Sequence, residues 1–374
     1  MKKLSALLTH LANPWRSACL RVLALALCGA CSASAVAACN DGVLISPTAV
    51  TANDISTLLH HRDFAKLDQL ADKYRIEMSL GSDGKPNLMG FYSGVSNTIA
   101  NCGDVKQSEK QWMAHQKLLL GWRKASPNTT PPAVALAQFM TAYAWHARGS
   151  GFSSGVTQEG QRLFDDRIAE ARAQFLAIDP KARNDPEWYV GMLTVGLAQG
   201  WDKSDFEAVF REAIAKFPTY YPLYIPKASF YSPKWYGSNQ EFQSFLNETV
   251  RATAPALGET MYARLEASQG NVEMFRNGQA DWKRMEAGLH RINGDFPGPW
   301  NLNVYAKYAC FAADVGSLRR LLGEIGQQVA YTAWGSKDQY ESCREFANTR
   351  FCWKWADDNA TGCEPLENVP VKKF

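Results

Sequence analysis

Phe217-Pro218-Thr219-Tyr220-Tyr221-Pro222-Leu223 is the stretch that decides the fold, because it closes one apolar helical stripe and opens the next. The same order of residue types returns in Phe296-Pro297-Gly298-Pro299-Trp300-Asn301-Leu302. A shorter version is Asp185-Pro186-Glu187-Trp188-Tyr189. Proline breaks a helix interior but suits the first turn of a new helix, and an aromatic side chain follows it each time. The repeated junction predicts consecutive helices that pack in pairs.

Apolar side chains around these junctions recur at intervals of three and four residues, which indicates amphipathic helices. The expected helices cover 107–124, 131–148, 158–178, 186–199, 203–216, 219–230, 239–253, 257–268, 279–294, 298–313, 315–328 and 337–349. We therefore predict an all-α fold of stacked helical hairpins with α-solenoid character. The unit from Trp300 through Tyr305 to Leu318 resembles a degenerate tetratricopeptide repeat, although Ser317 stands near a position where such repeats prefer alanine.

The N-terminal region carries a different pattern. Residues 52–74 have one apolar face at helical spacing, which predicts a single helix. Residues 76–80 and 88–92 alternate between apolar and polar side chains around Gly81-Ser82-Asp83-Gly84. Alternation on both sides of a Gly/Asp turn predicts a small β-hairpin.

The start of the chain has the pattern of a secretory signal peptide. Lys2 and Lys3 precede an apolar run at 22–30, and small residues lead to Ala35-Val36-Ala37. Cleavage is expected after Ala37. A membrane anchor is the alternative, but residues 22–39 contain too many small residues for a span of about 20 apolar ones.

Four regions follow from these patterns. We predict a signal peptide at 1–37, an N-terminal helix with a β-hairpin at 38–105, a helical-repeat body at 106–330 and a disulfide-stapled tail at 331–374. The mature protein is expected in the periplasm or outside the cell, with no transmembrane helix after signal cleavage.

Charge argues against a nucleic-acid partner. The whole chain has 40 basic and 37 acidic residues, and residues 1–37 hold four basic and no acidic ones. The mature chain therefore has 40 − 4 = 36 basic residues against 37 acidic ones, a net charge of −1. No positive excess remains to attract nucleic acid or an anionic membrane.

Six cysteines follow the predicted signal, and an even number in an exported chain predicts disulfides. The pairs that close loops without crossing are Cys39–Cys102, Cys310–Cys343 and Cys352–Cys363. Val36-Ala37-Ala38-Cys39 also resembles a lipoprotein processing box. Acylation of Cys39 would leave Cys102 without a partner, so parity favours the soluble form, and a lipoprotein anchored through Cys39 stays the alternative.

Three segments together resemble the bacterial domain-of-unknown-function family numbered 4034. They are the run from Ala142 to Phe152, Asp185-Pro186-Glu187-Trp188-Tyr189, and Ser232-Pro233-Lys234-Trp235-Tyr236-Gly237-Ser238. The resemblance spans roughly residues 60–250, and it leaves residues 300–374 unmatched. It implies an exported bacterial protein and supplies no catalytic residue.

The best local candidate for catalysis is Trp145-His146-Ala147-Arg148-Gly149. His146 with a carboxylate from the following helix, Asp165 or Glu170, would make a general acid/base pair. Alternatively, His146 and Arg148 end their helix and interact with its dipole, with Gly149 after it. After the predicted signal peptide, no His-Glu-x-x-His or Cys-x-x-Cys spacing occurs, so we predict no metal and no cofactor.

Aromatic residues supply the binding candidates, namely Trp145, Tyr221, Trp235 and Tyr236. Exposed rings of this kind stack on sugars or receive a peptide, whereas buried ones fill the space between helices. Pro233 and Gly237 place Trp235 and Tyr236 in a loop. We expect a non-catalytic scaffold with a protein or peptide partner; a periplasmic hydrolase using His146, or a protein binding cell-wall glycan at Trp235 and Tyr236, are the alternatives.

Overall fold

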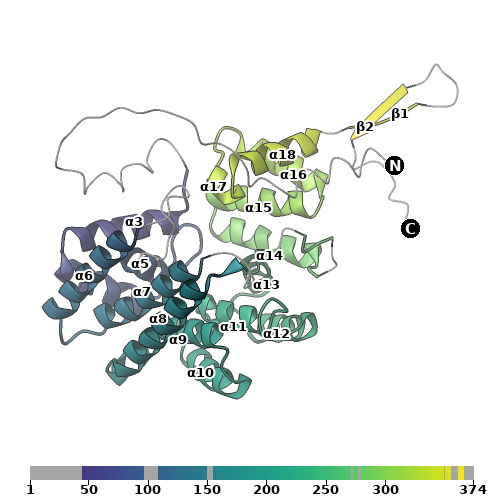
Figure 1. Cartoon of the computed structure of the whole chain (residues 1–374). Helices are drawn as coiled ribbons and strands as arrows, with labels where there is room; N and C mark the ends of the chain where they lie inside the picture. Colours follow the sequence, from purple (N-terminus) through teal and green to yellow (C-terminus); the bar gives the residue numbers. More distant parts are fainter. Residues whose placement is uncertain are drawn as a thin grey trace. The chain divides into compact units, whose positions relative to one another are not determined.

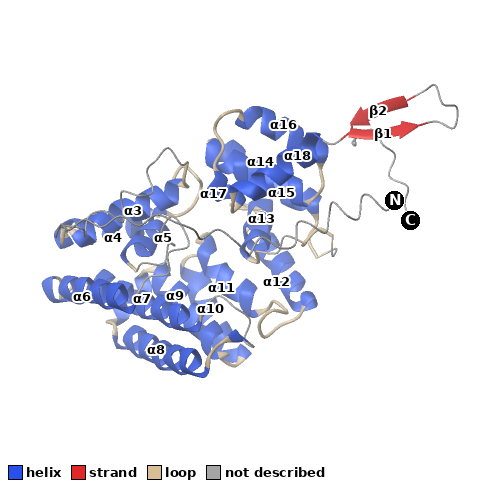
Figure 2. Ribbon diagram, turned by 45° about the horizontal axis from the view of Figure 1, so that its top comes forward, coloured by secondary structure: helices blue, strands red, loops and turns tan. Residues whose placement is uncertain are grey.

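The helices lie close to the ranges that the periodicity predicts (Figures 1 and 2). The computed structural model describes residues 44–96, 108–149, 155–270, 273–276 and 279–348, and the backbone of 350–354 and 361–365. Its α-helices are α3 (Pro47–His60), α4 (Phe64–Glu77), α5 (Asn87–Val95), α6 (Glu109–Ala125), α7 (Pro131–Arg148), α8 (Gln158–Ala177), α9 (Pro186–Gln199), α10 (Lys203–Lys216), α11 (Tyr224–Phe230), α12 (Asn239–Ala252), α13 (Glu259–Ser268), α14 (Trp282–Asp295), α15 (Pro299–Phe311), α16 (Val315–Ile325), α17 (Tyr331–Trp334) and α18 (Lys337–Asn348). Short 3₁₀ helices, η3 (Pro180–Asn184) and η4 (Tyr221–Leu223), precede α9 and α11.

Proline and polar caps set the helix starts that the sequence predicts. Pro131, Pro186 and Pro299 each occupy the first turn of a helix. The Asp185 carboxylate accepts a hydrogen bond from the Glu187 backbone N–H at 2.9 Å, which satisfies one of the unpaired donors at the start of α9. The helix starts are thus fixed locally.

Consecutive helices pack against each other, as an all-α stack of helical hairpins requires. The helix pairs α7/α8, α13/α14 and α15/α16 are antiparallel neighbours, and α6, α7 and α8 lie side by side in both ribbon views (Figures 1 and 2). One continuous apolar cluster runs between the helices and includes Phe139, Phe175, Phe206 and Phe230, each no more than 1% exposed. Burial of these rings is the main stabilising term of the stack.

The N-terminal expectations were wrong in two places. Residues 52–74 form two helices, because Arg62 takes a left-handed conformation at φ 57° and Asp63 caps the new helix α4 by accepting from the Lys66 N–H. The β-hairpin expected over 76–92 is not formed. Residues up to Glu77 are helical, α5 begins at Asn87, and only an isolated bridge joins Leu80 to Pro86.

Tertiary contacts explain why the hairpin is replaced. The buried Asp83 carboxylate accepts hydrogen bonds from the Thr48 backbone N–H and hydroxyl, which ties the 81–86 turn to the start of α3. Gly94 lets α5 approach α3 closely, since a Cβ there would lie 2.4 Å from the Ala52 carbonyl oxygen. The turn therefore joins two helices that pack on α3.

The C-terminal helices are joined by a disulfide between Cys310 of α15 and Cys343 of α18, which confirms that predicted pair. Strands β1 (Arg350–Lys354) and β2 (Thr361–Pro365) pair antiparallel, and this register sets Cys352 opposite Cys363. Their side chains, and the predicted pair Cys39–Cys102, lie outside the described residues.

The described residues all belong to one compact unit. The predicted signal peptide, residues 1–37, lies outside the described residues. Among the described residues, no helix combines the length and apolar character needed to cross a bilayer.

Candidate functional site

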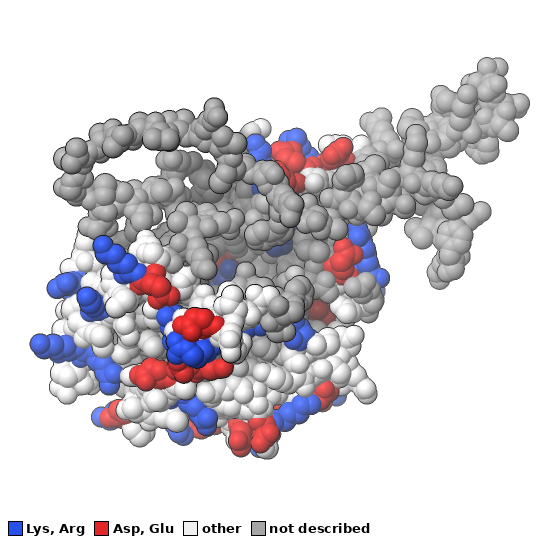
Figure 3. Space-filling view, viewed as in Figure 1, with Lys and Arg blue, Asp and Glu red and all other residues white. Residues whose placement is uncertain are grey.

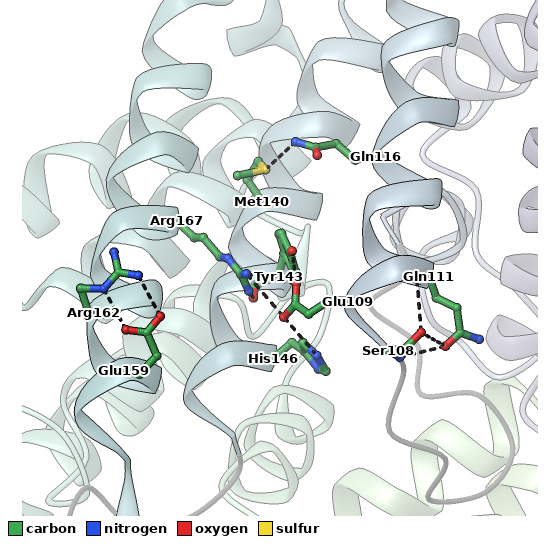
Figure 4. Close-up of polar contacts among 10 residues, drawn as sticks. All are labelled: Ser108, Glu109, Gln111, Gln116, Met140, Tyr143, His146, Glu159, Arg162 and Arg167. Carbon is green, nitrogen blue, oxygen red and sulfur yellow. Dashed lines mark hydrogen bonds and ion pairs between the residues drawn. The ribbon is translucent and has the colours of Figure 1, made fainter.

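The C-terminal end of α7 brings His146 beside Glu109, the first residue of α6 (Figure 4). The distance from His146 Nε2 to Glu109 Oε1 is 4.0 Å, and the imidazole packs on Trp112 with ring centroids 4.9 Å apart. Gly149 follows the helix at φ 78°, as expected of a residue that ends it. Sequence reasoning missed Glu109, which precedes α7 in the chain.

Glu109 is already engaged by two other side chains (Figure 4). The Tyr143 hydroxyl donates to Glu109 Oε2, and Arg167 Nη2 donates to the same oxygen at 3.2 Å. Burial raises the pKa of Glu109, but the hydrogen bond from Tyr143 and the charge of Arg167 outweigh it, and the pKa is lowered. An anionic carboxylate held in this way ties α6, α7 and α8 together and is a poor proton acceptor at neutral pH.

The carboxylates expected opposite His146 lie elsewhere, so that pairing was wrong. Asp165 is exposed and accepts a hydrogen bond from Gln161 of the same helix at 2.8 Å. Glu170 is exposed and accepts from Gln174, also of α8, at 2.7 Å. The face of α8 that meets α7 is apolar, and the residue that reaches the His146 region from it is Arg167.

Trp235 contacts both Trp145 and Tyr236, and we call these three residues the aromatic surface. Trp145 and Trp235 are partly buried against the core, and Tyr236 is exposed. The Trp145 and Trp235 rings contact edge to face, with centroids 5.7 Å apart and an interplanar angle of 90°. Trp235 and Tyr236 lie 6.1 Å apart, and Tyr236 is 45% exposed. Arg148 lies over the Trp145 ring at 5.5 Å. Three of the four aromatic candidates are therefore brought together.

The loop between α11 and α12 fixes the two rings that it carries. The Trp235 and Gly237 N–H groups both donate to the Ser232 carbonyl, at 3.0 and 3.2 Å, and the Tyr236 N–H donates to Phe230. A Cβ at position 237 would lie 2.1 Å from the Tyr231 carbonyl oxygen, so only glycine allows this close turn. The backbone of this loop therefore requires glycine at position 237.

Tyr221, the fourth candidate, is not part of this surface. It is 6% exposed, and the Arg264 guanidinium carbon lies 4.2 Å from its ring centroid. Burial, and then the charge of Asp83, raise the pKa of Tyr221 to about 12 although Arg264 opposes them. Tyr221 therefore fills space between helices, the alternative given for buried aromatic rings, because η4 packs this ring inward.

Asp185 and Glu187 are two buried carboxyl groups on either side of Pro186. The sequence around Pro186 indicated only the start of a helix, so neither group was predicted as a site residue. Asp185 accepts from the Tyr92 hydroxyl at 2.5 Å, and Glu187 accepts from Tyr220 at 2.5 Å and Gln138 at 2.9 Å. Burial raises the pKa of Asp185 to about 6 and that of Glu187 to about 7, against the hydrogen bonds that lower both. The pair connects α5, α7, α9 and Tyr220, the residue before η4, and its exposed fractions of 1% and 4% keep it away from solvent.

A pocket and a cluster of metal ligands are two further features that could mark a site in the described part of the chain. A pocket of about 330 Å³ is lined mainly by Phe175, Leu176, Ile178, Arg183 and Trp188, and contains none of the predicted site residues. Among the described residues, no group of three or more His, Cys, Asp or Glu side chains could hold a metal ion.

Comparison of the chain with protein-family models, with curated proteins and with solved structures gives no match. The geometry of the site is therefore the basis for the functional argument.

Proposed function

We propose that this protein is an exported, non-catalytic scaffold that binds a peptide segment of a partner protein at the aromatic surface formed by Trp145, Trp235 and Tyr236. The observation that carries the proposal is their convergence from α7 and the α11–α12 loop, with Tyr236 45% exposed. Among the described residues, Tyr236 is the one aromatic side chain among the large exposed apolar ones.

Rigid aromatic side chains are well suited to binding. Trp and Tyr bring a large flat area and lose little conformational entropy, because each has only two side-chain torsions. The backbone hydrogen bonds to Ser232 and Phe230, together with the contact between Trp145 and Trp235, hold the rings in place before a ligand arrives. Such preorganisation reduces the entropic cost of association.

Charge around the aromatic surface favours an acidic peptide. Lys234 is exposed directly before Trp235, and Arg148 lies over Trp145. Elsewhere, acidic and basic side chains alternate over the described residues seen in Figure 3, which agrees with a mature chain close to neutral. Carboxylate side chains flanking an apolar or aromatic residue would complement these rings and cations.

The geometry favours binding over hydrolysis. A general base must reach the proton that it removes, and Glu109 instead accepts hydrogen bonds from Tyr143 and Arg167. Membership of the domain-of-unknown-function 4034 family and a tetratricopeptide-like repeat belong to the same proposal. The pairwise packing of consecutive helices is compatible with a tetratricopeptide-like repeat.

Export is the remaining part of the proposal. The disulfide between Cys310 and Cys343 supports an oxidising compartment. Mass spectrometry of the mature protein should find an N-terminus at Ala38. An acylated Cys39 at the N-terminus would instead identify the lipoprotein form.

The binding proposal is tested by selecting peptides from a random phage-displayed library on the oxidised protein, then measuring their affinity by calorimetry. We expect enriched peptides to contain acidic and aromatic residues. Trp235→Ala or Tyr236→Ala should weaken binding by about 30-fold, the size typical of an aromatic hot spot. Ile76→Ala is the matched control, because Ile76 is 72% exposed on α4, outside the aromatic surface.

Circular dichroism must show that the variants keep the helical content of the parent. Failure to enrich any peptide, or equal affinity in Trp235→Ala and Ile76→Ala, would overturn the proposal. Sedimentation of the protein with purified peptidoglycan provides the competing outcome. If Trp235→Ala abolishes that sedimentation while no peptide is enriched, the surface binds glycan.

A further inference from the structure

A second group of residues, away from the aromatic surface, gathers positive charge around the 81–86 turn. Lys85 lies in that turn, Arg264 on α13 and Lys307 on α15. Arg264 Nη2 donates a hydrogen bond to the Gly84 carbonyl at 2.9 Å, and Lys85 Nζ lies 5.6 Å from the centroid of the Trp300 ring. The turn thus inserts a lysine beside two helices that are distant in sequence.

The carboxylate in this group, that of Asp83, pairs with Lys85 and also accepts a hydrogen bond from Thr48. Asp83 has a fully buried side chain whose two carboxylate oxygens share the hydrogen bond donated by the Thr48 hydroxyl, and it lies 3.7 Å from Lys85 Nζ. One anion against three cations leaves an excess of positive charge. The three cations are only partly buried, and the Lys85 side chain is 30% exposed, so an anion arriving from solvent can reach them.

Lys307 is the cation with the weakest compensation. Its Nζ lies 4.9 Å from the centroid of the Tyr308 ring, and among the described residues no carboxylate comes within 4.0 Å of it. Burial, and then the charge of Lys85, lower the pKa of Lys307 to about 8. Lys85 is affected in the same way by burial and by Arg264, with Asp83 opposing them.

Arg264 provides a separate observation, because one of its buried nitrogen atoms lacks a hydrogen-bond acceptor in the described part of the chain. Its Nε is buried and makes no hydrogen bond to any described residue, although the guanidinium group packs on Tyr221. Buried donors are satisfied in nearly all native proteins, so an oxygen acceptor from a ligand or from water would complete the group.

We propose that Lys85, Arg264 and Lys307 form a binding site for the phosphate or carboxylate group of a small anionic ligand. Arg264 contacts Gly84, the residue before Lys85. Lys85 lies over Trp300 of α15, the helix that also carries Lys307. The charge of Lys85 acts on Lys307, and the Trp300 ring offers a flat face for a sugar or aromatic ring attached to the anionic group. A bound anion accepts charge-assisted hydrogen bonds from the lysines and offsets their mutual repulsion. This site shares no residue with the aromatic surface, so its test is independent of the peptide proposal.

Calorimetry with inorganic phosphate and with glucuronate, at ionic strength fixed by chloride, tests the site in the oxidised protein. We expect saturable binding of at least one probe. Lys307→Met should weaken it by about tenfold or more, the loss of one charge-assisted hydrogen bond, whereas Lys307→Arg should keep most of it. Lys283→Met is the matched control, because Lys283 is exposed on α14.

Acetic anhydride labelling read by mass spectrometry keeps the test decisive if Lys307→Met fails to fold. In the unaltered protein the bound probe should slow acetylation of Lys307 and leave Lys283 unaffected. Binding by phosphate alone identifies a phosphorylated ligand, and binding by glucuronate alone identifies a carboxylate. The proposal is overturned if neither probe binds above chloride, if the Lys307 and Lys283 variants bind equally, or if both lysines are acetylated at unchanged rates.

Discussion

Replacing Glu187 with glutamine isolates the titration of one buried carboxyl group. Burial raises the pKa of Glu187 from its ordinary 4.5 to about 7 in the folded protein. The folded state therefore holds this proton to a higher pH than the unfolded state. Between the two values, stability falls as pH rises, because the unfolded chain releases the proton more readily.

The magnitude follows from the two pKa values. Relative to the protonated form, Glu187 lowers the free energy of unfolding by about 0.8 kcal/mol at pH 5 and about 3.3 kcal/mol at pH 8. Glutamine has nearly the same shape and does not titrate. The stability of Glu187→Gln relative to the parent should therefore increase by about 2.5 kcal/mol from pH 5 to pH 8. Asp185 adds to this change, since the charge of each carboxylate raises the pKa of the other.

Urea unfolding followed by circular dichroism at both pH values gives the two differences. Glutamine must reorganise its hydrogen bonds with Tyr220 and Gln138, which costs some stability at every pH, so the test uses the change between pH values. Subtracting the parent also removes other titrating groups such as His115, whose pKa burial lowers to about 4. A difference that is constant with pH, or that shrinks at pH 8, would refute the burial argument.

Two further predictions concern packing and the disulfide. Gly94→Ala should lower the free energy of unfolding by about 1–3 kcal/mol, because its Cβ would lie 2.4 Å from the Ala52 carbonyl oxygen. Gly323→Ala, whose Cβ would have nothing within 4 Å, should raise the free energy of unfolding by up to about 1 kcal/mol. Thermal unfolding of both variants checks this, and equal shifts would contradict the close α3–α5 packing. Replacing both Cys310 and Cys343 with serine removes a cross-link between residues 33 apart and should lower the free energy of unfolding by about 3–4 kcal/mol, measured by urea unfolding. If the parent protein is equally stable with and without dithiothreitol, this disulfide bond is not formed.

Helix boundaries could be predicted where proline or glycine marks them. The ranges 131–148, 186–199 and 203–216 match α7, α9 and α10, since Pro131, Pro186 and Gly200 define their ends. The break within 52–74 was missed because His61, Arg62 and Asp63 include neither residue. Arg62 adopts a positive φ that a sequence pattern does not reveal.

The candidate site was predictable only in part. Pro233 and Gly237 indicate that Trp235 and Tyr236 lie in a loop, which is confirmed. Nothing in the sequence shows that this loop packs against Trp145, because the contact joins two residues that are far apart in the chain. The same long-range packing selects Glu109 for His146 and excludes Asp165.

The most direct test of the binding account is hydrogen–deuterium exchange of the protein with and without a selected peptide. The account predicts slower exchange in the loop at 232–238 and in the last turn of α7 around Trp145. Slower exchange confined to the pocket near Leu176 and Arg183, with the loop unchanged, would show that the peptide binds elsewhere and would contradict it.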